Sequence, residues 1–155
     1  MVIAQRAEEA KAIWVLGDLY RIRLSGEQTA GAYALIECNV SAGNGPPPHI
    51  HLHDDETFWI VEGDFSFLAG DKTVRLQTGS CVHVPRNTLH TFKNEGSTSG
   101  RLLVLISPPG LEKFFERISE PVTDISSPPP VTPETLQKVL ALAPEYGMEI
   151  PPPPQ

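Results

Sequence analysis

The chain has 155 residues, the length of one domain with a substantial hydrophobic core. It carries 12 Lys and Arg against 19 Asp and Glu, and a net charge of −7 disfavours nucleic acid or an anionic membrane as a partner. No apolar run reaches the length of a membrane-spanning helix, and the amino terminus lacks a signal-peptide pattern. Two cysteines, Cys38 and Cys81, are too few for a disulfide framework, so we expect a cytoplasmic protein.

Residues 12–107 consist of short runs rich in β-branched and aromatic residues, after a polar arm at residues 1–11. Turn signals recur about every 8–12 residues, which is typical of a sandwich or barrel. No interior stretch has a helical period. The expected strands are AIWVL, LYRIRLS, AYALIECNV, HIHLH, ETFWIVEG, DFSFLAG, KTVRLQTG, SCVHVP, LHTFKN and RLLVLIS.

Residues 108–155 predict a helical, proline-rich C-terminal extension, because 12 of the 16 prolines lie there. LEKFFERIS places apolar residues on one helical stripe. A second helix is expected to begin with Thr132 as its N-cap and Pro133 as its first residue, and to stop by Gly147. The sequence thus predicts an all-β domain with one or two C-terminal helices.

All five histidines fall between His49 and His90. His49 and His51 are two residues apart, so a strand would present both imidazoles on one face. Strict alternation would place Glu56 on the other face, and a bulge or turn within LHDD must reset the phase. With His90, the set offers three imidazoles and one carboxylate, which suits one divalent first-row transition metal ion (Fe, Mn, Ni, Co, Cu or Zn) and leaves coordination positions open.

Two segments carry a resemblance to a known family. GNGPPPHIHLHDDETFWIVEG, from Gly43, resembles the first cupin motif, G-x5-H-x-H-x4-E-x6-G, and GSCVHVPRNTLHTFKN, from Gly79, resembles the second, G-x5-P-x-G-x2-H-x3-N. The one departure is Asn87, which stands where the pattern has glycine and tolerates a left-handed backbone. The resemblance implies a double-stranded β-helix (jelly-roll) cupin barrel over residues 12–107. It extends to the single-domain cupins that are like quercetin 2,3-dioxygenase.

A second register of the first motif uses His51 and His53, but it leaves only two residues before Glu56, fewer than the pattern requires. We therefore prefer His49, His51, Glu56 and His90 as the metal ligands. His83 reads either as a support for a ligand or as an ordinary barrel histidine. Asp54 and Asp55 read as a solvated turn.

The strand phase also nominates a substrate pocket. Phe58 and Ile60 share the phase of Glu56, and Phe92 shares that of His90, so these three are expected in an apolar pocket wall. Phe114 and Phe115 either close this pocket or pack on a sheet.

The resemblance implies a metal-dependent dioxygenase that acts on a small, oxygen-rich molecule such as a flavonol or an enol. Glu56 would then serve as ligand and general base. A non-catalytic metal- or small-molecule-binding cupin and a cupin isomerase or lyase are the alternatives. The motif strands contain few Lys or Arg to hold an anionic sugar, which disfavours an isomerase. We also expect a homodimer, because the strands before residue 40 and the helix of Phe114 and Phe115 need cover.

Overall fold

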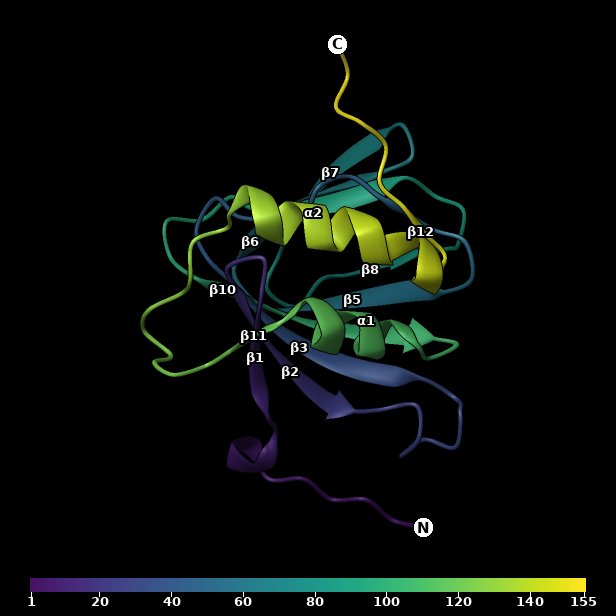
Figure 1. Ribbon diagram of the computed structural model, residues 1–155, viewed down its shortest axis with the longest axis vertical. Coiled ribbons are helices and arrows are strands. Elements are labelled where there is room, and N and C mark those ends of the chain that lie inside the picture. Colours follow the sequence, from purple (N-terminus) through teal and green to yellow (C-terminus); the bar gives the residue numbers. More distant parts are fainter.

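Two antiparallel sheets form a barrel in the computed structural model, which describes residues 1–155 (Figure 1). The larger sheet has the strand order β11-β1-β2-β3-β10-β5-β8, and the smaller one has the order β7-β6-β9. A bridge between His49 and His90 joins β9 to the segment of β4, and β4 pairs with β12. The predicted all-β jelly roll with two C-terminal helices is confirmed. The barrel strands are β1 (Ala12–Val15), β2 (Asp18–Leu24), β3 (Ala34–Val40), β4 (Ile50–His51), β5 (Asp55–Glu62), β6 (Asp64–Ala69), β7 (Lys72–Gln77), β8 (Cys81–Val84), β9 (His90–Asn94) and β10 (Gly100–Ser107).

The core follows from alternation along the central strands. In β10, Leu102, Val104 and Ile106 are buried while their neighbours are more exposed, as a strand with one buried face requires. Phe65 and Phe67 of β6 meet them from the smaller sheet as part of one buried cluster. The side chains that face inward on β5 and β9 therefore lie between the two sheets.

The C-terminal helices α1 (Leu111–Ile118) and α2 (Pro133–Leu142) lie on the same side of the barrel, in front of the sheets in Figure 1. Thr132 caps α2 as expected, since its hydroxyl accepts a hydrogen bond from the Thr135 amide. The remaining elements are the 3-10 turns η1 (Ala7–Glu9) and η2 (Ala143–Tyr146) and the strands β11 (Glu120–Pro121) and β12 (Met148–Glu149).

The two short strands of the extension were not expected from the sequence. β11 pairs with β1 and β12 pairs with β4, so the extension is hydrogen-bonded to the barrel at two places. Two-residue strands have no periodicity of their own and depend on their partners. The division into arm, barrel and extension at residues 11 and 107 stays a proposal.

Two backbone positions shape the entry to β4 and β9. Gly45 passes so close to the Phe92 carbonyl that a Cβ there would collide with it, so only glycine fits. Asn87 has a φ of 64° and adopts the left-handed conformation in which the cupin pattern has glycine. Its amide donates a hydrogen bond to the His51 carbonyl, 2.7 Å away, which ties the turn before β9 to β4. No helix is long and apolar enough to cross a membrane.

Candidate metal centre

Three histidines and one glutamate meet inside the barrel. His49 and His51 come from the segment of β4, Glu56 from β5 and His90 from β9, so both sheets contribute. A bend after His51 resets the strand phase before β5 begins. All four side chains are buried, and their potential ligand atoms lie within 4.8 Å of one another. This span is close to the roughly 4 Å that separates opposite donors of one bound ion, since each metal–nitrogen bond is about 2.0–2.1 Å.

Hydrogen bonds orient the imidazole rings for coordination. His49 Nδ1 donates to the Pro47 carbonyl at 2.8 Å, and His90 Nδ1 donates to the Thr88 carbonyl at 2.9 Å. A carbonyl oxygen only accepts, so both rings carry their hydrogen on Nδ1. Their Nε2 lone pairs are therefore free for a metal ion, in the arrangement that metal-bound histidines usually have.

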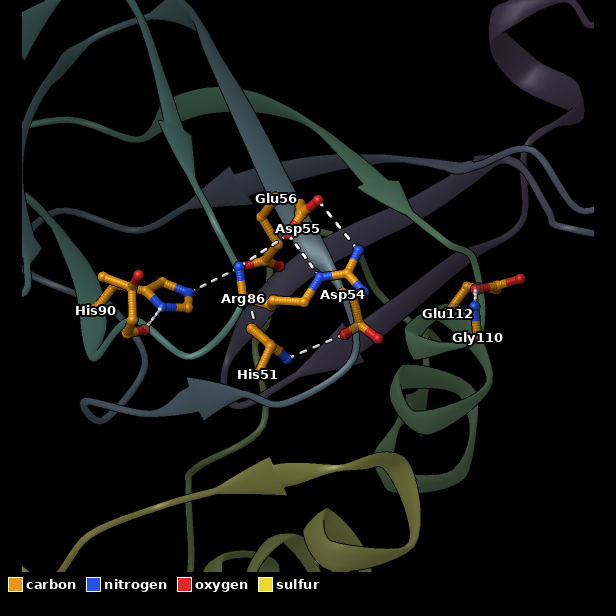
Figure 2. A network of polar contacts seen from close by, with 9 residues as sticks. His51, Asp54, Asp55, Glu56, Arg86, His90, Gly110 and Glu112 are labelled. Carbon is orange, nitrogen blue, oxygen red and sulfur yellow. Dashed lines mark hydrogen bonds and ion pairs between the residues drawn. The ribbon is translucent and has the colours of Figure 1, made fainter.

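The contacts of Glu56 point to a cation at the same place. Its Oε2 lies 2.8 Å from His90 Nε2 and 3.3 Å from His51 Nε2 (Figure 2). Because Nδ1 of His90 already carries hydrogen, its Nε2 and the carboxylate are two acceptors unless a proton or a metal ion lies between them. The buried ring nitrogens of His51 have no hydrogen-bond partner. The donor set thus fits a divalent transition metal ion, and the cluster could hold one.

The pKa values of the cluster residues in the protein without metal show which protons must leave when a metal ion binds. Burial, with the nearby His90 and His51, lowers the pKa of His49 to about 3. Burial also acts to lower the pKa of His51, but Glu56 and Asp54 outweigh it and raise that pKa to about 9. Although burial favours a protonated Glu56, the imidazoles of His51 and His90 hold the pKa of its carboxyl well below the usual range. A metal ion would therefore displace a proton from His51 and find Glu56 already ionised.

Asp54 is a site residue that the sequence reasoning missed. It does not lie in a solvated turn: it is 7% exposed, and its Oδ2 lies 3.2 Å from His51 Nδ1 (Figure 2). Neither atom has a hydrogen-bond partner elsewhere. Asp55, beside it, is the first residue of β5 and not part of a turn; it points outward and forms an ion pair with Arg86. The adjacent acids Asp54 and Asp55 gave no signal of this difference, because only the bend before β5 turns one of them inward.

A small cavity of about 60 Å³ opens beside the cluster. Phe58 and Phe92 line it, whereas Ile60, a predicted wall residue, is buried in the core and is not among the lining residues. Phe114 and Phe115 of α1 line the cavity, and the Phe115 ring also packs on Tyr20 of β2, 5.1 Å between ring centroids, so both roles expected for this pair are present. His49, His51 and Glu56 of the cluster also line it, and the remaining lining residues are Val15, Leu16, Tyr20, Ile36, Cys38, Pro46, Pro47, Val104, Leu111, Ile118, Val139, Met148 and Ile150.

The other two histidines lie outside the cluster. The ring of His53 packs against Gly147. His83 is exposed on the outer face of the sheet, where its Nδ1 lies 2.9 Å from the Thr57 hydroxyl. The structure thus brings together His49, His51, Glu56 and His90 and leaves the alternative ligand His53 apart.

Comparison with known proteins agrees with this geometry. Residues 36–106 match the family model described as a cupin domain. The chain is 30% identical over 107 residues to quercetin 2,3-dioxygenase of Bacillus subtilis, an alignment that covers 68% of this chain and 31% of that protein. The chain therefore spans about a third of the length of that curated relative.

Solved structures show the same fold at lower identity. KdgF from Halomonas matches with a TM-score of 0.65 at 18% identity, over 73% of this chain and 99% of that one. The polyketide cyclase RemF from Streptomyces resistomycificus matches with a TM-score of 0.61 at 23% identity, over 68% and 79% of the two chains. The motifs, the barrel and these similarities together identify the chain as a cupin that resembles quercetin 2,3-dioxygenase.

Proposed function

We propose that this cupin is a metal-dependent dioxygenase that acts on a flavonol or another small molecule with an enolic hydroxyl. One observation carries the proposal: three imidazoles and a carboxylate meet in one buried cluster, and His49, His51 and Glu56 of that cluster line a cavity whose other walls are apolar. His49, His51, Glu56 and His90 would hold one divalent first-row ion. When bound, the ion supplies Lewis acidity that favours the anion of a substrate hydroxyl.

Residues of this chain would accept the substrate proton and bind the substrate. Glu56 is the general base: its carboxylate lines the cavity beside the imidazoles and accepts the proton of the substrate hydroxyl. Phe58 and Phe92 offer flat apolar surface to an aromatic substrate and exclude water from the anion. No Lys or Arg lines the cavity, which disfavours an isomerase or lyase of anionic sugars.

The test combines metal analysis with oxygen uptake. Protein purified without added metal should contain a transition metal and consume oxygen with one member of a panel of flavonols, catechols and 1,3-diketones. Tight binding of a panel member without oxygen consumption would instead select the alternative of a non-catalytic binding cupin. His90→Ala should lose most of the metal, while His53→Ala, the matched control outside the cluster, should keep it.

Glu56 is tested separately from the metal. Glu56→Gln keeps an oxygen ligand and the shape of the side chain, so it should retain much of the metal. It removes the base, and turnover should fall by about 10²–10⁴-fold. Full turnover in Glu56→Gln would show that another group accepts the proton.

We also propose a homodimer in the cytoplasm, on grounds that differ from the sequence argument. Phe114 and most of β1 are already buried within one chain. Among the exposed apolar residues, Trp59 of β5 and Leu105 of β10 point outward from the larger sheet. Both cysteines are free thiols, in keeping with a reducing compartment.

A further inference from the structure

The cavity beside the cluster is too small for the proposed substrate. Its volume of about 60 Å³ is well below the roughly 300–1,000 Å³ of pockets that hold drug-sized ligands. The ligand atoms are also buried, since His51 and His90 are each 2% exposed. A flavonol therefore reaches the cluster only if part of the wall moves.

A second hollow lies on the other side of one section of this wall. It is an outer groove of about 450 Å³, large enough for a flavonol. Met148 and Ile150 line both the cavity and the outer groove. The partition between the two spaces is thus built from β12 and the residue after it. The remaining residues of the outer groove are Leu52, Leu140, Ala143, Pro144, Gly147 and Glu149.

The segment that carries this partition has little backbone pairing with the barrel, and its other polar contacts are those of Arg117 on α1 with Glu145 at 2.6 Å and the Tyr146 hydroxyl at 3.3 Å. β12 pairs with β4 over two residues only, with Met148 opposite His51, and the Leu52 amide donates to the Gly147 carbonyl at 2.8 Å. In α2 only Val139 is buried, whereas four residues of α1 are. Elements with little buried apolar surface open at low free energy.

We propose that Met148 and Ile150 are specificity-determining residues, and that residues 133–150, called the cap below, swing outward to admit a flat aromatic molecule from the outer groove. The side chains of Val139, Met148 and Ile150 then set the size of the molecule that fits when the cap closes again. The nature of the substrate rests on the proposed dioxygenase function, whereas the movement does not.

Hydrogen exchange in the unaltered, metal-loaded protein tests the movement directly. The Leu52 amide is bonded to the cap, while the Asn87 amide is bonded to the His51 carbonyl within the barrel. Cap opening exposes the first amide and not the second, so Leu52 should exchange at least about tenfold faster than Asn87. Equal protection of the two amides would overturn the proposal.

A pair of variants tests the partition. Met148→Ala removes a buried side chain from the cap, while Leu140→Ala removes one that is 54% exposed and lines only the outer groove. A chelator should strip Zn²⁺ from Met148→Ala about tenfold faster than from the unaltered protein or Leu140→Ala, with the equilibrium Kd for Zn²⁺ unchanged. An unchanged stripping rate in a folded Met148→Ala protein would contradict the proposal.

The selection of size is read from two probes, quercetin and the smaller catechol. Met148→Ala should strengthen quercetin binding relative to catechol binding by about tenfold, because the enlarged pocket favours only the larger molecule. Equal changes for both probes would show that Met148 does not select by size. If Met148→Ala strengthens quercetin binding in this way but no oxygen is consumed, the dioxygenase proposal is refuted and the cap proposal stands. If oxygen is consumed but Met148→Ala changes neither the rate of Zn²⁺ release nor the preference between quercetin and catechol, the cap proposal is refuted and the dioxygenase proposal stands.

Discussion

The buried carboxylate of Asp54 makes His51 differ from the other two histidines of the cluster. The Nδ1 atoms of His49 and His90 face neutral backbone carbonyls, whereas that of His51 faces a carboxylate. A carboxylate behind an imidazole raises its basicity and fixes its orientation toward a metal ion. His51 is therefore expected to be the strongest nitrogen donor of the three.

A substitution at Asp54 should thus weaken metal binding without touching a ligand. Asp54→Asn is expected to raise the Kd for Zn²⁺ or Co²⁺ about 10–100-fold, measured by competition with a chelator of known affinity. Asp55→Asn, next to it and turned outward, is the control and should leave the Kd unchanged. The visible spectrum of the Co²⁺ protein should shift in Asp54→Asn alone.

The raised pKa of His51 makes metal binding dependent on pH. Between about pH 6.5 and pH 9 the folded protein without metal keeps a proton on His51, which must leave when the ion binds. Metal affinity should therefore rise across this range, and titrations in buffers of different ionisation enthalpy should show about one proton released per ion at pH 7.5.

The same proton on His51 makes the free energy of unfolding of the metal-free protein depend on pH. The folded pKa of about 9 lies above the ordinary value of 6.5, so the stabilisation is complete below pH 6.5 and is lost as pH rises through 9. The urea midpoint should accordingly fall between pH 6.5 and pH 8.5, and His51→Gln should flatten this slope. A slope that persists in His51→Gln would assign the effect to another group.

At the scale of elements, one buried carboxylate fastens α1 to the barrel. Glu112 is 2% exposed, and its two oxygens accept hydrogen bonds from the Gly26 amide at 2.9 Å and from the Gly110 amide at 2.7 Å (Figure 2). It thereby joins the loop after β2 to the start of the helix that carries Phe114 and Phe115. The cavity wall is held in place from outside the metal centre.

Removal of this carboxylate should cost stability. Glu112→Ala leaves the buried Gly26 amide and the partly buried Gly110 amide without a partner, and a buried group of this kind costs about 1–3 kcal/mol. Urea denaturation should show a loss of about 2–4 kcal/mol, whereas Glu116→Ala, at an outward position of the same helix, should change little. A loss of similar size in both variants would mean that helix propensity, and not the two hydrogen bonds, is responsible.

At the scale of the molecule, the sequence predicted those features of the fold that depend on residues close together in the chain. Strand phase predicted that His49 and His51 share a face, the spacing of the cupin motifs added Glu56 and His90, and the turn at Asn87 followed from the conformational tolerance of asparagine. What they could not supply were contacts made across long stretches of chain. The pairing of β12 with β4 and the inward turn of Asp54 depend on where the barrel places its neighbours.

Ile60 illustrates the limit of strand phase. It shares the phase of Glu56 and does face inward, but it lies deeper in the core than the cavity reaches. Phase gives the face of a strand, whereas the position of a cavity along that face depends on which side chains fill the barrel. Phe65 and Phe67, which are buried in the same core cluster as Ile60, are among the side chains that fill the barrel.

The apolar residues that point outward from the larger sheet predict where two chains would meet in a homodimer. If Trp59, which is 50% exposed, lies in a homodimer contact, light scattering should give the mass of two chains, and Trp59→Ser should shift it toward one. Val74→Ser, on β7 of the other sheet, is a control with comparable exposure and should not change the mass. A single-chain mass for the unaltered protein at working concentration would refute the dimer.

The pairing of β12 with the histidine-bearing strand also has a consequence for biosynthesis. His49, His51, Glu56 and His90 leave the ribosome well before Met148, which lies opposite His51 in the finished fold. During this interval the nascent barrel presents its ligands without the strand that later covers them. If the proposed cap controls access, metal can enter at that stage without any movement of the cap, and its later exchange depends on how often β12 separates from β4.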